Sequence, residues 1–156
     1  MDYSFARPQA QLHCVPAHRK ALARCGGLSR EHDIQWGIGH CLAYLGCCLW
    51  IQGDFVQAKM IGEEAFRSSE AIGDVWFMAS GINFVLARAL VGLQEYDEAE
   101  KQLERSLRWH KELETGDTAW RVAATCSNLG KVALLTQDYA NAMLEFAKAV
   151  AFRFCM

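Results

Sequence analysis

Residues 74–116 read DVWFMASGINFVLARALVGLQEYDEAEKQLERSLRWHKELETG. This stretch holds two patterns of apolar residues at i, i+3 and i+4, separated by a short polar turn, which is typical of two amphipathic helices. The same arrangement begins again at Asp33 and at Asp117, so the chain repeats with periods of 41 and 43 residues. A fixed period of about 20 to 50 residues is typical of solenoids and helical arrays.

The three copies agree at positions where helices must approach one another. Thirteen residues after each start stands a small residue preceded by leucine, and twenty-one residues after it an acidic residue followed by an aromatic one. An alanine comes three residues after that aromatic residue. The aligned sets are Leu45-Gly46, Leu86-Ala87 and Leu129-Gly130; Asp54-Phe55, Glu95-Tyr96 and Asp138-Tyr139; and Ala58, Ala99 and Ala142. Small side chains are needed where two helix axes cross closely, because a larger one overpacks the contact.

The sequence therefore predicts an all-α fold, a right-handed superhelical array of antiparallel helix pairs. The expected helices are residues 16–25, 34–52, 55–72, 75–92, 96–114, 118–136 and 139–154. Links of two to four residues force neighbouring helices to pack antiparallel. We expect an N-terminal segment, 1–32, with a cap or partial-repeat helix, followed by the array with units at 33–73, 74–116 and 117–156.

Composition narrows the classes of partner. The formal charge is −2, so we expect no nucleic acid, whose phosphates are bound mainly by clustered lysine and arginine. The longest nearly apolar run, Ile38 to Ile51, is shorter than a membrane span, and we expect no membrane partner. The first residues lack the apolar segment of a signal peptide. Seven cysteines without a CxxC pair favour reduced, buried thiols and a cytoplasmic protein.

The leucine-glycine pair and the later Gly-Asp-Phe with its alanine resemble the tetratricopeptide repeat (TPR). They appear as Leu45-Gly46 with 53–55 and Ala58, and again around Leu129-Gly130. The repeat is longer than the usual 34 residues. The long form also has an Asp-led start with a following tryptophan, GDVW at 73–76 and GDTAW at 116–120. In this it is similar to repeats of bacterial transcription activators of the maltose-regulator type and of multidomain nucleotide cyclases. Similar long repeats occur in eukaryotic adaptors of the Leu-Gly-Asn type. The resemblance implies a non-catalytic module that binds a protein or peptide in a concave groove. The alternative is a sensor or regulatory segment of a larger signalling protein.

In arrays of this kind the first helix of each pair lines the concave face. Helical spacing from the small crossing residues predicts which residues line that face: His40, Cys47, Trp50, Phe84, Arg88, Ser127 and Lys131. Arg88 and Lys131 are placed to hold a carboxylate or phosphate; the alternative is that each is solvated or paired with a nearby glutamate. Trp50 and Phe84 are either aromatic anchors for a partner or part of the core. The chaperone-tail clamp of some relatives needs lysine and asparagine at two positions of the first unit. This chain has Ala43 and Cys47 there, so we do not expect a chaperone tail as its ligand.

No residue set indicates catalysis, so we expect no enzyme and no cofactor. A nucleophile would need a positioned histidine and an orienting group, and a phosphate site a glycine-rich loop. Three residues near the start, His13, Cys14 and His18, and the pairs His40-Cys41 and Cys47-Cys48 do not give four metal ligands in paired spacings. Cys47-Cys48 as a redox pair is a minor alternative.

The last helix ends in AKAVAFRFCM, where Val150, Phe152 and Phe154 face nothing predicted. A solenoid end needs a polar cap. Either the chain is a piece of a longer array, or this end meets a partner or a second copy, which makes self-association a possible property.

Overall fold

The computed structural model describes residues 20, 22–25, 27–28, 31, 35–113 and 118–154, and these contain helices and no strand. The elements are α2 (Gln35–Gln52), α3 (Phe55–Ala71), α4 (Val75–Gly81), η1 (Ile82–Leu86), α5 (Ala87–Gly92), α6 (Tyr96–Glu112), α7 (Thr118–Leu135) and α8 (Tyr139–Phe154). Residues 22–25 are helical too, whereas Asp33 and half of the expected helix 16–25 (residues 16–19 and 21) lie outside the described residues.

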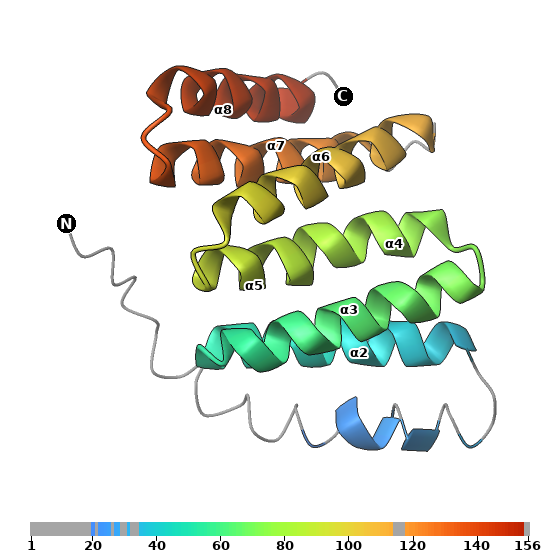
Figure 1. The fold of residues 1–156 in the computed structure, drawn as a ribbon. Coiled ribbons are helices and arrows are strands. Elements are labelled where there is room, and N and C mark those ends of the chain that lie inside the picture. The colour runs from blue at the N-terminus through green and yellow to red at the C-terminus, as the bar shows by residue number, and fades with distance from the viewer. Residues whose placement is uncertain are drawn as a thin grey trace.

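The helices form neighbouring pairs that stack along the chain (Figure 1). α2 packs on α3, the stretch Val75–Gly92 packs on α6, and α7 packs on α8, while α3 and α6 each also contact the next pair. The predicted all-α array of paired helices is confirmed, and each of these helices begins and ends within two residues of its expected bounds. One feature was not predicted: residues 75–92 are continuous but contain a π-helical turn, η1, between α4 and α5.

The turns within and between pairs share one design. In four of them the first residue after a left-handed position donates its N–H to a carbonyl five residues back, as Glu95 does to Leu90, which is the Schellman arrangement that ends a helix. Gly53 and Gly73 hold the left-handed position without strain, but Gln94 and Gln137 hold it with φ of 64° and 66°.

Aspartates begin the following helices. The side chains of Asp54, Asp74 and Asp138 accept hydrogen bonds from the backbone N–H three residues on, at 3.2, 2.9 and 3.1 Å. Glu95, at the same place before α6, makes no such side-chain bond. These caps satisfy donors that a helix start otherwise leaves without a partner.

The small residues lie where helices cross. A Cβ on Gly46 would overlap the Val85 side chain of η1, and a Cβ on Gly130 would lie 2.8 Å from the Phe146 ring of α8. Ala58, Ala99 and Ala142 are buried. The central core joins Ile82, Leu86 and Leu90 to Leu103 of α6 and Val132 of α7, so the middle pair is held from both sides.

In the described part of the chain, Val75–Gly92 is the one stretch long and apolar enough to span a membrane by length and composition. However, 67% of that stretch is buried inside the fold, as in a core helix. The apolar character of these residues is accounted for by their packing against α2, α3, α6 and α7.

Candidate functional site

Three adjoining hollows follow the first helix of each pair, and together we call them the groove. The aromatic hollow, of about 310 Å³, lies among α2, α4, η1 and α7. The central hollow, of about 420 Å³, is lined mainly from α2, α5 and α7, together with Phe55 of α3 and Leu103 of α6. The C-terminal hollow, of about 340 Å³, is lined from α5, α7 and α8. The last two share Arg88, Asn128 and Lys131.

The seven residues predicted for the concave face all line this groove. His40, Cys47 and Phe84 line the aromatic hollow; Trp50, Arg88 and Lys131 line the central one; Ser127 lines the C-terminal one. The structure thus brings them together on one side of the molecule. Their role in binding a partner stays a prediction.

Arg88 is held between two aromatic rings. Its Cζ lies 5.1 Å from the ring centroid of Trp50, on α2, and 5.6 Å from that of Phe84, on η1. Cation–π contacts of this kind hold a guanidinium in place while leaving its N–H donors available. Trp50 and Phe84 are both half-buried, and Trp50 also packs against the cluster of Leu49, Ala58 and Ala89. They serve core and groove at once.

A second cation stands beside Arg88. Partial burial and, after it, the positive charge of Arg88 lower the pKa of Lys131. The ion pairs formed among the described residues join Lys59 to Glu95, Lys101 to Glu98 and Lys148 to Glu145, and none reaches Arg88 or Lys131. The expected alternative of a glutamate partner is therefore not found in the described residues. Two like charges close together without a counter-ion favour the binding of an anion.

The groove contains no acidic side chain among the described residues that line it. The helices beneath it, α2, Val75–Gly92 and α7, contain no aspartate or glutamate anywhere, although the whole chain has 18 acidic residues and a net charge of −2. The acidic residues of the described pairs lie instead on α3, α6 and α8 and in the turns. The groove is therefore a cationic surface on a weakly acidic protein.

Rings and guanidinium groups follow one another through the aromatic hollow. Phe84 lies 5.9 Å from Trp120, ring centroid to ring centroid. The Cζ of Arg121 lies 4.3 Å from the Trp120 centroid and 3.9 Å from that of Trp76. Beyond them Phe77 stacks on His40 at 4.0 Å. Arg121 is buried, and its Nη1 donates to the Ser80 hydroxyl at 2.6 Å, so these groups form a fixed wall.

The π-helical turn η1 is tied to both neighbouring first helices. The Cys47 thiol of α2 donates to the carbonyl of Phe84 at 3.7 Å. From the other side, the Asn128 side-chain amide of α7 donates to the Asn83 backbone carbonyl at 3.2 Å and to its Oδ1 at 2.7 Å. Turns of this kind are frequent at functional sites. Here the turn supplies Phe84 at the junction of the aromatic and central hollows.

Four of the described thiols show no sign of activation. Burial is the first cause that raises the pKa of Cys47 and of Cys48, and burial raises the pKa of Cys41 and of Cys126 to about 11. A raised pKa leaves little thiolate, the reactive form. No cluster of three His, Cys, Asp or Glu that could hold a metal occurs in the described residues. His13, Cys14 and His18 lie outside them.

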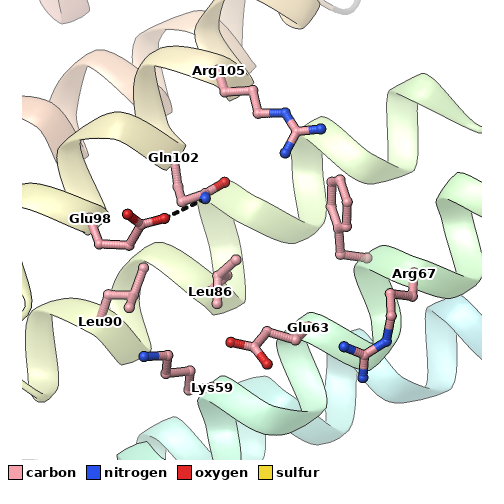
Figure 2. A pocket seen from close by; sticks show the side chains of 9 residues that line it. Lys59, Glu63, Arg67, Leu86, Leu90, Glu98, Gln102 and Arg105 are labelled. Carbon is pink, nitrogen blue, oxygen red and sulfur yellow. Dashed lines mark hydrogen bonds between the residues drawn. The ribbon is translucent and has the colours of Figure 1, made fainter.

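The opposite side of the molecule carries a smaller hollow of about 190 Å³ between α3 and α6, with Leu86 and Leu90 between its walls (Figure 2). Charges of both signs line it, and three of the charged side chains contact their neighbours. Lys59 pairs with Glu95 at 2.5 Å, Gln102 donates to Glu98 at 2.7 Å, and Arg105 lies over Phe66 and Trp109. Unlike the groove, this hollow is therefore lined by both acidic and basic side chains.

Sequence reasoning missed several groove residues, namely Tyr44, Gly81, Trp120, Arg121 and Asn128. Trp120 aligns with Phe77, which is buried, yet Trp120 is 39% exposed in the last described pair. The sequence did contain one signal for the cationic character of the groove: all three first helices lack aspartate and glutamate.

Residues 80–112, from the end of α4 through α6, match the family model described as tetratricopeptide repeat. The match includes Phe84 and Arg88 of the groove. The match covers a single repeat. The resemblance of the whole chain to the longer form of the repeat, with its period of 41 to 43 residues, therefore stays a prediction. No curated protein sequence matches the chain. Repeats of this family generally mediate protein–protein interactions and are generally not catalytic.

Proposed function

We propose that this chain, which is a tetratricopeptide-repeat protein, binds an acidic peptide segment of a partner protein in its groove. The single observation that carries the proposal is the pair Arg88 and Lys131, two neighbouring cations without a carboxylate partner among the described residues. An incoming carboxylate would relieve their mutual repulsion and accept charge-assisted hydrogen bonds, which are roughly twice as strong as neutral ones. The groove does no chemistry in this proposal.

The surroundings of the pair favour an anion further. Because the described lining residues include no aspartate or glutamate, nothing in the groove competes with the ligand for the two cations. The rings of Trp50 and Phe84 already hold Arg88, so less side-chain entropy is lost when a ligand binds. The same positive surface would repel basic segments, which gives selectivity as well as affinity.

The test uses short synthetic peptides that differ only in charge, with glutamate, glutamine or lysine at the same positions. Binding is measured by fluorescence polarisation to wild type and to Arg88→Glu/Lys131→Glu. A matched control, Lys101→Glu/Arg108→Glu, makes the same change of charge on exposed positions of α6. Circular dichroism confirms that each variant is folded.

We expect wild type and the α6 control to bind the glutamate peptides, and the groove variant to bind them about tenfold or more weakly. Added salt should weaken the binding, because exposed charges are screened. The proposal is wrong if glutamate and glutamine peptides bind wild type equally, or if the α6 control loses as much affinity as the groove variant.

A second contact is proposed for α8, where Met143, Leu144 and Val150 are 74%, 53% and 54% exposed. Residues 143 and 150 are two turns apart on one side of the helix, with Ala147 between them. This side carries no charge, so we propose that it packs against the same side of a second copy. Sedimentation of wild type should then show a concentration-dependent dimer that Met143→Glu/Val150→Glu removes. A wild type that stays monomeric at high concentration would exclude this contact.

A further inference from the structure

One glycine of the groove has no packing reason to be glycine. Within α3 to α8, a Cβ on Gly62, Gly92 or Gly130 would press on a neighbouring side chain or backbone. A Cβ on Gly81 would meet nothing within 4 Å, and its φ of −60° and ψ of −42° suit any residue. Glycine inside a helix costs about 1 kcal/mol relative to alanine. The residue therefore costs stability while leaving space, and the space it leaves is the aromatic hollow.

The lining of that hollow determines what chemistry it can receive. Its walls are the rings of Trp76, Phe77, Phe84 and Trp120, and Gly81 and Ala43 leave the space between them open. A positively charged ligand is disfavoured, since the buried guanidinium of Arg121 is part of the wall and no described acidic residue lines it. An aromatic side chain suits both features, because rings pack edge-to-face or offset against other rings and their faces attract a guanidinium.

We infer that the aromatic hollow receives an aromatic side chain of the same partner segment whose acidic group binds Arg88 and Lys131. This inference rests on the proposed function and specifies its ligand: a segment in which a tryptophan, tyrosine or phenylalanine lies near an acidic residue. Charge complementarity fixes the acidic part, and the ring-lined space beside Gly81 fixes the aromatic part.

The distance between the two sites sets the spacing in the ligand. Phe84 stands between them, with its ring centroid 5.6 Å from the Arg88 Cζ and 5.9 Å from the Trp120 centroid. An extended chain advances about 3.3 Å per residue, so the aromatic and acidic residues lie within about three positions of each other.

The experiment compares two peptides of glutamate and glycine that are identical except for one central residue, tryptophan or alanine. Each carries the same dye, and binding is followed by fluorescence polarisation. The proteins are wild type, Gly81→Leu and Ala71→Leu. Gly81→Leu extends a side chain into the open space, whereas Ala71→Leu places the same leucine side chain at an exposed position at the end of α3. Trp120→Ala is a second variant, which removes a half-exposed ring instead of filling the space.

Wild type and Ala71→Leu should bind the tryptophan peptide about tenfold or more tightly than the alanine peptide, as expected for burying a large apolar side chain. Gly81→Leu and Trp120→Ala should lose this preference and keep the weaker binding of the alanine peptide. The inference is overturned if the two peptides bind wild type equally, or if Gly81→Leu keeps the preference. Equal binding of both peptides that still depends on Arg88 and Lys131 would leave the proposed function intact, whereas no binding of either peptide would overturn both.

Discussion

Gly46→Ala and Gly81→Ala should change stability in opposite directions, although both replace a buried helical glycine by the same residue. Alanine is favoured over glycine inside a helix by about 1 kcal/mol. At Gly81 the added Cβ meets nothing within 4 Å, so this gain should appear almost undiminished. At Gly46 the added Cβ overlaps the side chain of Val85.

Val85 has little freedom to move away. It is 1% exposed, and its β-branched side chain is stiff at χ1. Overpacking a core contact typically costs about 1–3 kcal/mol, which exceeds or at least cancels the helix-propensity gain. We therefore expect Gly81→Ala to be stabilised by up to about 1 kcal/mol and Gly46→Ala to be destabilised by up to about 2 kcal/mol.

Equilibrium unfolding in urea, followed by far-ultraviolet circular dichroism, measures both variants beside wild type. In a protein of this size, 1 kcal/mol corresponds to roughly 2–4 °C in Tm, so thermal melting gives a second readout. If Gly46→Ala proved as stable as Gly81→Ala, the close crossing of α2 and η1 would be wrong. A destabilised Gly81→Ala would contradict the open space beside that residue.

Three further changes test other parts of the fold. Ala99→Leu places a large side chain in the fully buried contact between α6 and the stretch Val75–Gly92, and should cost about 1–3 kcal/mol in the free energy of unfolding measured in urea. Gln94→Gly, at a left-handed position with φ of 64°, should raise Tm by a few degrees, since a non-glycine residue there costs about 1 kcal/mol; an unchanged or lower Tm would contradict the strain at this turn. Burial and, after it, the positive charge of Arg121 lower the pKa of His110 from 6.5 to about 4, so the unfolded chain binds the extra proton between these pH values. Wild type should then lose stability as the pH falls from about 6.5 towards 4, by at most about 1.4 kcal/mol per unit from this residue, and His110→Gln should show a flatter pH dependence in urea unfolding at pH 7 and pH 5.

The periodic sequence predicted the helices well because the repeat marks both ends of each one. Aspartate at the helix start and glycine after the helix end are local signals, and the structure uses them at Asp54, Gly53 and Gly73. Gln94 and Gln137 hold the same left-handed turns without glycine. There the same hydrogen bond closes the turn, from Glu95 to the carbonyl of Leu90 and from Asp138 to that of Ala133.

The π-helical turn could not be read from the sequence, because it depends on contacts between helices. Val85 lies against Gly46 of α2, and Asn83 accepts hydrogen bonds from Asn128 of α7. Neither contact leaves a periodic pattern in residues 82–86 themselves. Helical spacing alone therefore predicts a regular helix there.

The candidate groove could be predicted in part. Spacing from Gly46, Ala87 and Gly130 placed seven residues on the face where the three hollows lie. It missed Trp120 and Arg121, which lie nine or more residues before Gly130, near the start of α7. Which side chains stack between which rings depends on the distances between neighbouring first helices, and these are not local properties of the sequence.

The central claim is that an acidic peptide lies in the groove formed by the first helices. Photo-crosslinking measures this most directly: a glutamate-rich peptide with a photoreactive group is bound to wild type and irradiated, and mass spectrometry locates the attached residues. The account predicts crosslinks on α2, α5 and α7 around Trp50, Arg88 and Lys131, and their loss in Arg88→Glu/Lys131→Glu. Crosslinks confined to α3 and α6, on the other side of the molecule, would contradict it.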